Sequence, residues 1–421
     1  MKTLLINAIV NNKKQNLLID NQFIAYIGND FPETDKVLDL SGKHIISGMI
    51  DPHTHIRDLA QKDKEDWLSA TKAAIAGGVT TLFDMPNTKP PTTNLKNLQK
   101  KREVAKKALV NYRFNLAATS ENIDDLKEIL NQKNKDIGGL KLFLAGSNSN
   151  EFVNDIDAIK QIFQLSLQYD IPLIIHTEWQ ECIEKYSQKI ANPQAEHHNY
   201  LRHRECAIKG TQLVVDLAKQ IGNQIVIAHT SLSEEIEIIR KAKAQAQIYC
   251  EVSPHHLLLN ENAIQKSGNF AKVNPPLRSK KDNEALWNAL LDGTVDFIGS
   301  DHAPHQKTEK LKSYSLAPSG FPGLETSLPL LLYQVKQGRI SMQRLEEIVS
   351  KNTAKIFKIE KRGIVKQGYF ADLAIFDLTT SATVNIDNFH TKAKYSPFEN
   401  MPVVPIEMSI IKGKIYKNTK L

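Results

Sequence analysis

Short apolar runs alternate with longer amphipathic stretches through the middle of the chain. The apolar runs are five or six residues long and rich in Val, Ile, Leu and Phe, as buried strands are. They cover residues 78–83, 139–144, 171–175, 224–228, 247–252 and 295–299. Between them, residues 155–169 and 234–246 repeat apolar positions at helical spacing. Strands that alternate with helices indicate a parallel sheet covered by helices, and this number of units favours a closed barrel.

The two ends of the chain have a different pattern of short strands and turn residues. Strand-like runs separated by Asn, Asp and Gly lie at residues 4–6, 16–19, 23–27, 371–376 and 406–411. We predict an α/β fold, a (β/α)₈ TIM-like barrel with a small β-sandwich domain formed by both termini. The predicted sandwich comprises residues 1–47 and 360–421, and the predicted barrel comprises residues 48–359.

Composition and charge exclude several other classes of protein. Of the 421 residues, 41% are hydrophobic and 24% are charged, so the chain can bury a sizeable core. The net charge of +7 comes from scattered lysines and arginines without a basic aromatic stripe, so we expect no nucleic acid partner. No apolar run is long enough to span a membrane, and the N-terminus does not resemble a signal peptide. Cys182, Cys206 and Cys250 have no CxxC spacing, so we expect no disulfide framework and a cytoplasmic location.

Side chains that can bind metal follow the apolar runs, at the ends of the predicted strands. They are His53, His55, His176, His229 and Asp301. The carboxyl ends of barrel strands converge on one face, so these distant residues are predicted to be neighbours. The i, i+2 spacing of His53 and His55 places both imidazoles on the same side of an extended chain, which suits two ligands of one metal ion.

Lys141 lies inside the apolar run 139–144, where a lysine is unusual. One interpretation is a strand-end lysine whose ammonium reaches water. The other is a buried amine, whose pKa would be lowered because burial disfavours the ammonium form. Such an amine could add CO₂ and give a carbamate, whose two oxygens could bridge two divalent cations. The spacing leaves both interpretations open.

Other histidines have weaker signals. His255 and His256 follow a predicted strand and could lie at the metal site or simply pack beside it. His305 is a better candidate for contact with substrate. We expect surface positions for three histidines of one polar segment: His197, His198 and His203.

Seven segments together carry a family resemblance. They are residues 48–58 (GMIDPHTHIRD), 84–88 (DMPNT), 139–143 (GLKLF), 250–257, 274–278, 300–305 and 320–326. These segments resemble the motifs of dihydroorotases, binuclear zinc enzymes of the amidohydrolase superfamily. The resemblance covers most of the chain, and the combination is far more specific than an HxH pair alone.

The resemblance implies two Zn²⁺ per subunit. One would be held by His53, His55, Lys141 and Asp301. The other would be held by Lys141, His176 and His229. A carboxylated Lys141 and a hydroxide would lie between the two ions, and Asp301 would be the catalytic acid and base.

The resemblance also implies how substrate is held. The substrate carboxylate would be bound by Arg57 and Asn87, with help from Asn274 and His305. A planar guanidinium suits a carboxylate. Arg57 and Asn87 distinguish dihydroorotases from hydantoinase-like and allantoinase-like relatives, whose substrates lack a ring carboxylate.

The sequence departs from the family pattern in places. Residues 58–60 (Asp-Leu-Ala) replace a common Pro-Gly, so the adjoining loop is expected to differ. Segment 144–150 resembles bacterial members more than the animal enzyme. Ala228 stands where some relatives have a cysteine that binds a third metal, which argues against a third site.

The implied activity is reversible, zinc-dependent hydrolysis of the cyclic amide of (S)-dihydroorotate to N-carbamoyl-L-aspartate, in de novo pyrimidine biosynthesis. The partner would therefore be a small-molecule substrate, and the family suggests a homodimer and a possible association with aspartate transcarbamoylase. Two alternatives remain: another cyclic amidase of the hydantoinase or allantoinase type, and an inactive homologue that acts as a structural partner of aspartate transcarbamoylase.

Overall fold

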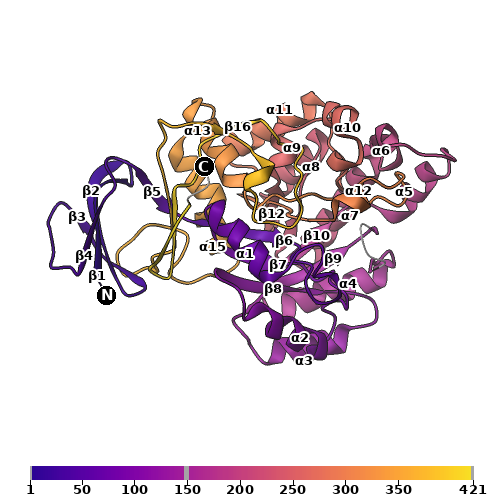
Figure 1. The fold of residues 1–421 in the computed structure, drawn as a ribbon. Coiled ribbons are helices and arrows are strands. Elements are labelled where there is room, and N and C mark those ends of the chain that lie inside the picture. Colours follow the sequence, from indigo (N-terminus) through magenta and orange to yellow (C-terminus); the bar gives the residue numbers. More distant parts are fainter. Residues whose placement is uncertain (1, 147–150, 419–421) are drawn as a thin grey trace.

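The computed structural model describes residues 2–146 and 151–418, which form two eight-stranded sheets with helices around one of them (Figure 1). Part of segment 144–150, namely residues 147–150, lies outside the described residues. In the part of the chain that is described, no helix is both long and apolar enough to cross a membrane.

The first sheet is the predicted parallel barrel. Its strands follow chain order: β6 (Met49–Thr54), β7 (Val79–Asp84), β8 (Asn111–Ala117), β9 (Ile137–Phe143), β10 (Leu173–His176), β11 (Ile225–Ile227), β12 (Ile248–Val252) and β13 (Phe297–Ile298). All neighbouring strands are parallel. A parallel bridge between Thr54 and His302 joins the chain after β13 to β6 and closes the barrel.

Helices cover the outside of the barrel and share its main apolar core. The longer ones are α1 (Trp67–Ala76), α2 (Leu95–Ala105), α3 (Ile123–Asn131), α4 (Ile156–Gln168), α7 (Arg204–Ile221), α8 (Ser233–Ala242), α11 (Lys280–Leu291) and α13 (Ser327–Lys336). Shorter ones are α5 (Gln180–Ser187), α6 (His198–Leu201), α9 (Pro254–Leu258), α10 (Asn262–Ser267), α12 (Lys307–Lys310), α14 (Met342–Glu346) and α15 (Asn352–Ile356). Both predicted helices are present, as α4 and α8, although α8 ends four residues before the predicted boundary at residue 246.

The second sheet combines strands from both termini, as predicted. It contains β1 (Lys2–Val10), β2 (Lys13–Asp20), β3 (Phe23–Gly28), β4 (Lys36–Asp39), β5 (His44–Ser47), β14 (Leu373–Phe376), β17 (Met408–Ile411) and β18 (Lys414–Lys417). β14 pairs antiparallel with β5 and thereby connects the two ends of the chain. This sheet has its own apolar cluster, which includes Leu5, Ile45 and Leu373.

The segment between β14 and β17 does not join the second sheet. Its strands β15 (Ala382–Thr383) and β16 (Pro402–Val403) pair with each other. Phe389 and Phe398 of this segment share an apolar cluster with Leu259 and Phe321 of the barrel loops. Part of the predicted sandwich range therefore packs on the barrel, while the domain boundaries themselves stay a prediction.

Candidate metal centre

The end of β6 and the loop after β13 bring three of the predicted ligands together. Asp301 Oδ1 lies 3.1 Å from His55 Nε2 and 3.4 Å from His53 Nε2. All three side chains are buried, and their ligand atoms lie within 4.8 Å of one another. His53 Nδ1 donates to Glu251 Oε1 at 2.7 Å, and His55 Nδ1 donates to Asn87 Oδ1 at 2.6 Å. The lone pair on each Nε2 therefore faces Asp301 and is available to a metal ion.

The ends of β10 and β11 supply the second predicted group. His176 Nδ1 lies 3.1 Å from His229 Nε2, and both residues are buried. His176 Nε2 faces Glu178 Oε2 at 3.1 Å, so Nδ1 carries the free lone pair. The rings of His53 and His229 are 5.2 Å apart between centroids, so the two groups of ligands form one cluster.

The charge states in the cluster suit a divalent cation. Burial lowers the pKa of all four histidines, so the imidazoles are neutral and can coordinate metal. Burial alone would raise the pKa of Asp301, but His53 and His55 outweigh it and lower that pKa to about 2. Neutral imidazoles around an ionised carboxylate are a donor set that zinc prefers.

Lys141 reaches the same cluster from β9. It is completely buried, and its Nζ has no hydrogen-bond partner among residues 2–146 and 151–418. Burial lowers the pKa of this amine to about 8, against the opposing charges of Glu251 and Asp301. The structure thus excludes a lysine whose ammonium reaches water, and leaves a buried amine beside four imidazoles and one carboxylate.

Two of the four predicted substrate residues line the cavity of the cluster, and the other two contact each other. Asn87 and Asn274 line the same cavity as the histidines and Asp301. Arg57 and His305 are buried and contact each other, with Arg57 Nη2 3.3 Å from His305 Nε2. Arg57 is only 2% exposed, and within the described chain its Nε has no hydrogen-bond partner, as expected of a donor that awaits an anion.

Comparison with known proteins places this arrangement in a family. The model of the amidohydrolase family matches residues 44–416. The chain belongs to the amidohydrolase family. It is 34% identical over 420 residues to the dihydroorotase of Methanosphaera stadtmanae, covering 96% of this chain and 94% of that protein. The dihydroorotase of Lactobacillus delbrueckii subsp. bulgaricus is 33% identical, with 95% and 94% covered. The resemblance to dihydroorotases predicted from the motifs is therefore confirmed.

Solved amidohydrolase structures share the whole fold. L-hydantoinase (dihydropyrimidinase) from Arthrobacter aurescens superimposes with a TM-score of 0.94 at 27% identity, covering 100% of this chain and 97% of that one. Dihydropyrimidinase from Brevibacillus agri gives 0.92 at 26% identity, with 100% and 96% covered. The predicted fold class is confirmed.

Two carboxylates that support the amidohydrolase ligands were missed in the sequence. Glu251 holds His53 and also accepts from the His229 backbone N–H at 3.1 Å. Glu178 is completely buried and holds His176, while Arg202 donates to its Oε2 at 2.6 and 2.9 Å. The available signal was their position: Glu251 interrupts an apolar run, and Glu178 follows two residues after a ligand.

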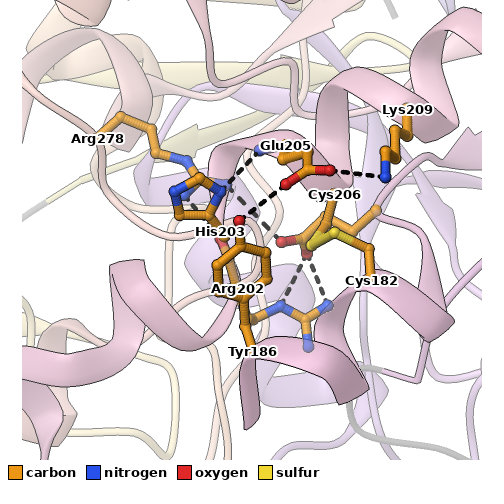
Figure 2. The surroundings of a disulfide bond; sticks show 9 residues. Cys182, Tyr186, Arg202, His203, Glu205, Cys206, Lys209 and Arg278 are labelled. Carbon is orange, nitrogen blue, oxygen red and sulfur yellow. Dashed lines mark hydrogen bonds and ion pairs between the residues drawn. A yellow bond between two sulfur atoms is a disulfide. The ribbon is translucent and has the colours of Figure 1, made fainter. Parts of the chain in front are cut away.

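A disulfide corrects the expectation drawn from the cysteines. Cys182 in α5 pairs with Cys206 in α7, close to Arg202 (Figure 2). The two cysteines are 24 residues apart, and they meet because α5 packs against the start of α7. Sequence spacing without CxxC could not show that packing. Cys250 is buried outside this pair.

Three other histidines, His198, His255 and His256, are buried. His198 is buried: its Nε2–H donates to Val273 O at 2.8 Å and its Nδ1 accepts from the Tyr314 hydroxyl at 2.7 Å, so its predicted surface position is wrong. The sequence showed only its polar neighbours, not the barrel loops that cover it. His256 donates to Pro275 O at 3.1 Å, and the His255 ring contacts the His256 ring edge to face. This favours the packing interpretation for both.

Proposed function

We propose that this chain is a dihydroorotase. It hydrolyses the ring amide of (S)-dihydroorotate to N-carbamoyl-L-aspartate and catalyses the reverse cyclisation, a step of de novo pyrimidine biosynthesis. The observation that carries the proposal is the buried guanidinium of Arg57, whose Nε has no hydrogen-bond partner among the described residues and which feels the charge of the ligand Asp301. A cyclic amide with a ring carboxylate matches this arrangement, because its carboxylate would bind Arg57 and its amide would lie at the metal-binding side chains.

Two zinc ions per subunit would fit the ligands. His53, His55 and Asp301 would hold one ion, His176 and His229 would hold the other, and Lys141 as a carbamate would bridge them. This proposal is supported by the Nζ of Lys141, which has no hydrogen-bond partner among the described residues. A buried polar group without a partner is costly, and carboxylation would convert this amine into a carbamate whose oxygens could bind the cations. Bound zinc would lower the pKa of water and polarise the amide carbonyl.

Asp301 would move the proton. It is ionised at neutral pH because His53 and His55 hold its pKa low. Its carboxylate would accept the proton of the attacking water and deliver it to the ring nitrogen that leaves. Asn87 has its Oδ1 occupied by His55, so its amide N–H would be the group that contacts substrate.

The ring carboxylate would be bound by Arg57 and His305, with Asn87 and Asn274 at the cavity wall. Binding of the carboxylate would orient the ring amide towards the metal-binding residues. Such orientation accounts for much of the rate enhancement of an enzyme. A hydantoinase-like activity is the second candidate, because the two solved structures quoted above are a hydantoinase and a dihydropyrimidinase.

A substrate panel tests the proposal. The zinc-loaded protein should hydrolyse dihydroorotate at least a hundredfold more efficiently than dihydrouracil, hydantoin or allantoin. Arg57→Met should remove that preference. A higher kcat/KM for hydantoin or dihydrouracil than for dihydroorotate would replace the proposal by the second candidate. Zinc-loaded protein with no turnover of any of these would favour the inactive homologue.

We also propose a cytoplasmic homodimer and an association with aspartate transcarbamoylase. The support is the similarity to dihydroorotases. The buried Cys182–Cys206 disulfide opposes a reducing compartment, because disulfides are rare there. Alkylation of cell lysates with a thiol trap would show whether the pair is oxidised in the cell, and light scattering would give the oligomeric state.

A further inference from the structure

The loop after β6 places a lysine behind the substrate histidine. Residues 57, 58 and 59 have φ values of 64°, 25° and 52°, which are unfavourable for non-glycine residues, so other contacts must hold the loop. One contact is the Asp58 N–H, which donates to Glu65 O at 3.0 Å. The turn brings Lys64 Nζ to 3.2 Å from His305 Nδ1 and 2.8 Å from Glu309 Oε1.

His305 has one proton to share between two nitrogens. The ring is buried, and burial together with the charges of Arg57, Lys64 and Lys310 lowers its pKa, so it is neutral. Nδ1 faces the Lys64 ammonium, which can only donate. Glu309 Oε2 is 3.9 Å from Nδ1, beyond hydrogen-bonding distance. Nδ1 therefore accepts, and the proton belongs on Nε2.

The other side of the ring agrees with this tautomer. His305 Nε2 lies 3.0 Å from the Ser319 carbonyl oxygen, to which an N–H can donate. Arg57 Nη2 is 3.3 Å away and cannot donate to a nitrogen that already carries a proton. The guanidinium is thus left to bind an anion. Ser319 lines the cavity, so the Nε2–H lies at the cavity edge.

We propose that Lys64 is a positioning residue that holds His305 in its Nε2–H tautomer, so that the ring offers Arg57 no lone pair and the guanidinium is left to donate to the substrate carboxylate. The proposal rests on the proposed function, because it takes a ring carboxylate as the ligand. Without the ammonium, Glu309 would attract the proton to Nδ1. Nε2 would then accept from Arg57 and turn a lone pair towards the substrate anion.

The test compares three variants. Lys64→Met removes the donor at similar length, and Lys64→Arg retains a donor. Lys392→Met is the matched control, because Lys392 holds the same loop through Asp66 and Lys62 but does not touch His305. The first measurement is ¹⁵N NMR of histidine-labelled, zinc-loaded protein without substrate, with His305→Asn to assign the signal.

The wild type, Lys64→Arg and Lys392→Met should all show the Nε2–H tautomer, and Lys64→Met should show Nδ1–H. The KM for dihydroorotate should rise about tenfold in Lys64→Met with kcat changed less than threefold, whereas Lys64→Arg should stay within about threefold of wild type. An unchanged tautomer in Lys64→Met would overturn the proposal. An equal rise in KM in Lys392→Met would show that Lys64 acts through the loop instead. The NMR result needs no turnover, so a wild type inactive on dihydroorotate would overturn the proposed function separately.

Discussion

The buried amine of Lys141 is an unfavourable group in the site. Burying a polar group without a hydrogen bond costs about 1–3 kcal/mol, and burying a charge without a partner costs more. Lys141 has neither a hydrogen-bond partner in the described chain nor access to water. A carbamate bound to cations would remove that cost, which links the chemistry of one residue to occupancy of the metal site.

Lys141→Ala should therefore lose zinc and activity together. We expect less than one zinc per subunit and a loss of kcat/KM of at least a thousandfold, because the bridging ligand is gone. Zinc would be counted by plasma mass spectrometry. The wild type, grown with ¹³C-bicarbonate, should show a carbamate signal by ¹³C NMR that the variant lacks. Full zinc content and full turnover in Lys141→Ala would contradict a bridging role for Lys141.

Glu178 is expected to act on the second ion through His176. Glu178→Gln keeps the shape but weakens the hydrogen bond that fixes the imidazole. Loss of such a supporting carboxylate typically weakens metal affinity by about 10- to 100-fold. Chelator competition should show one weakened zinc per subunit and one unchanged. Two unchanged affinities would contradict a supporting role, and two weakened ones would indicate general disruption.

His198 should make stability depend on acid pH. Burial, with Lys272 nearby, lowers its pKa to about 3, below the value of about 6.5 in an unfolded chain. The unfolded state therefore binds the proton more tightly, so stability is complete above pH 6.5 and falls as pH falls towards 3. The loss between pH 6.5 and 4.5 should be about 2–3 kcal/mol. Urea unfolding of wild type and His198→Gln should differ in this slope, and parallel pH curves would contradict the prediction.

At the scale of elements, the strand ends were predictable and the contacts between elements were not. The six apolar runs correspond to barrel strands β7 and β9 to β13, so that His176 and Asp301 fell at or just after strand ends. β8 was missed because Asn115 interrupts its apolar pattern, although that side chain is buried inside the sheet. Lys64 contacts His305, which is distant in sequence, so no local spacing marks it.

The disulfide joins two helices that carry no ligand themselves. It closes a loop with a sequence separation of 24, and such a cross-link stabilises by about 3 kcal/mol in the chain-entropy model. The double variant Cys182→Ser/Cys206→Ser should lose about that amount in urea unfolding. Reductant should destabilise the wild type similarly and leave the double variant unchanged. Equal stability of the oxidised wild type and the double variant would contradict this.

At the scale of the whole molecule, the barrel gathers one site from chain segments that are far apart. His53 and Asp301 are separated by most of the barrel sequence, and they meet because the bridge between Thr54 and His302 closes the sheet. The segment 382–403 packs over the loops at this end, while the second sheet holds both termini together. The barrel and the sheet formed by both termini could be predicted from the sequence. The packing of segment 382–403 on the barrel loops could not.

The most direct test is an anomalous-scattering map at the zinc edge from crystals of zinc-loaded protein. It should show two adjacent peaks, one beside His53, His55 and Asp301 and the other beside His176 and His229, with density extending from Lys141 between them. A single peak, peaks elsewhere, or none in protein that turns over dihydroorotate would contradict a binuclear centre built from these side chains.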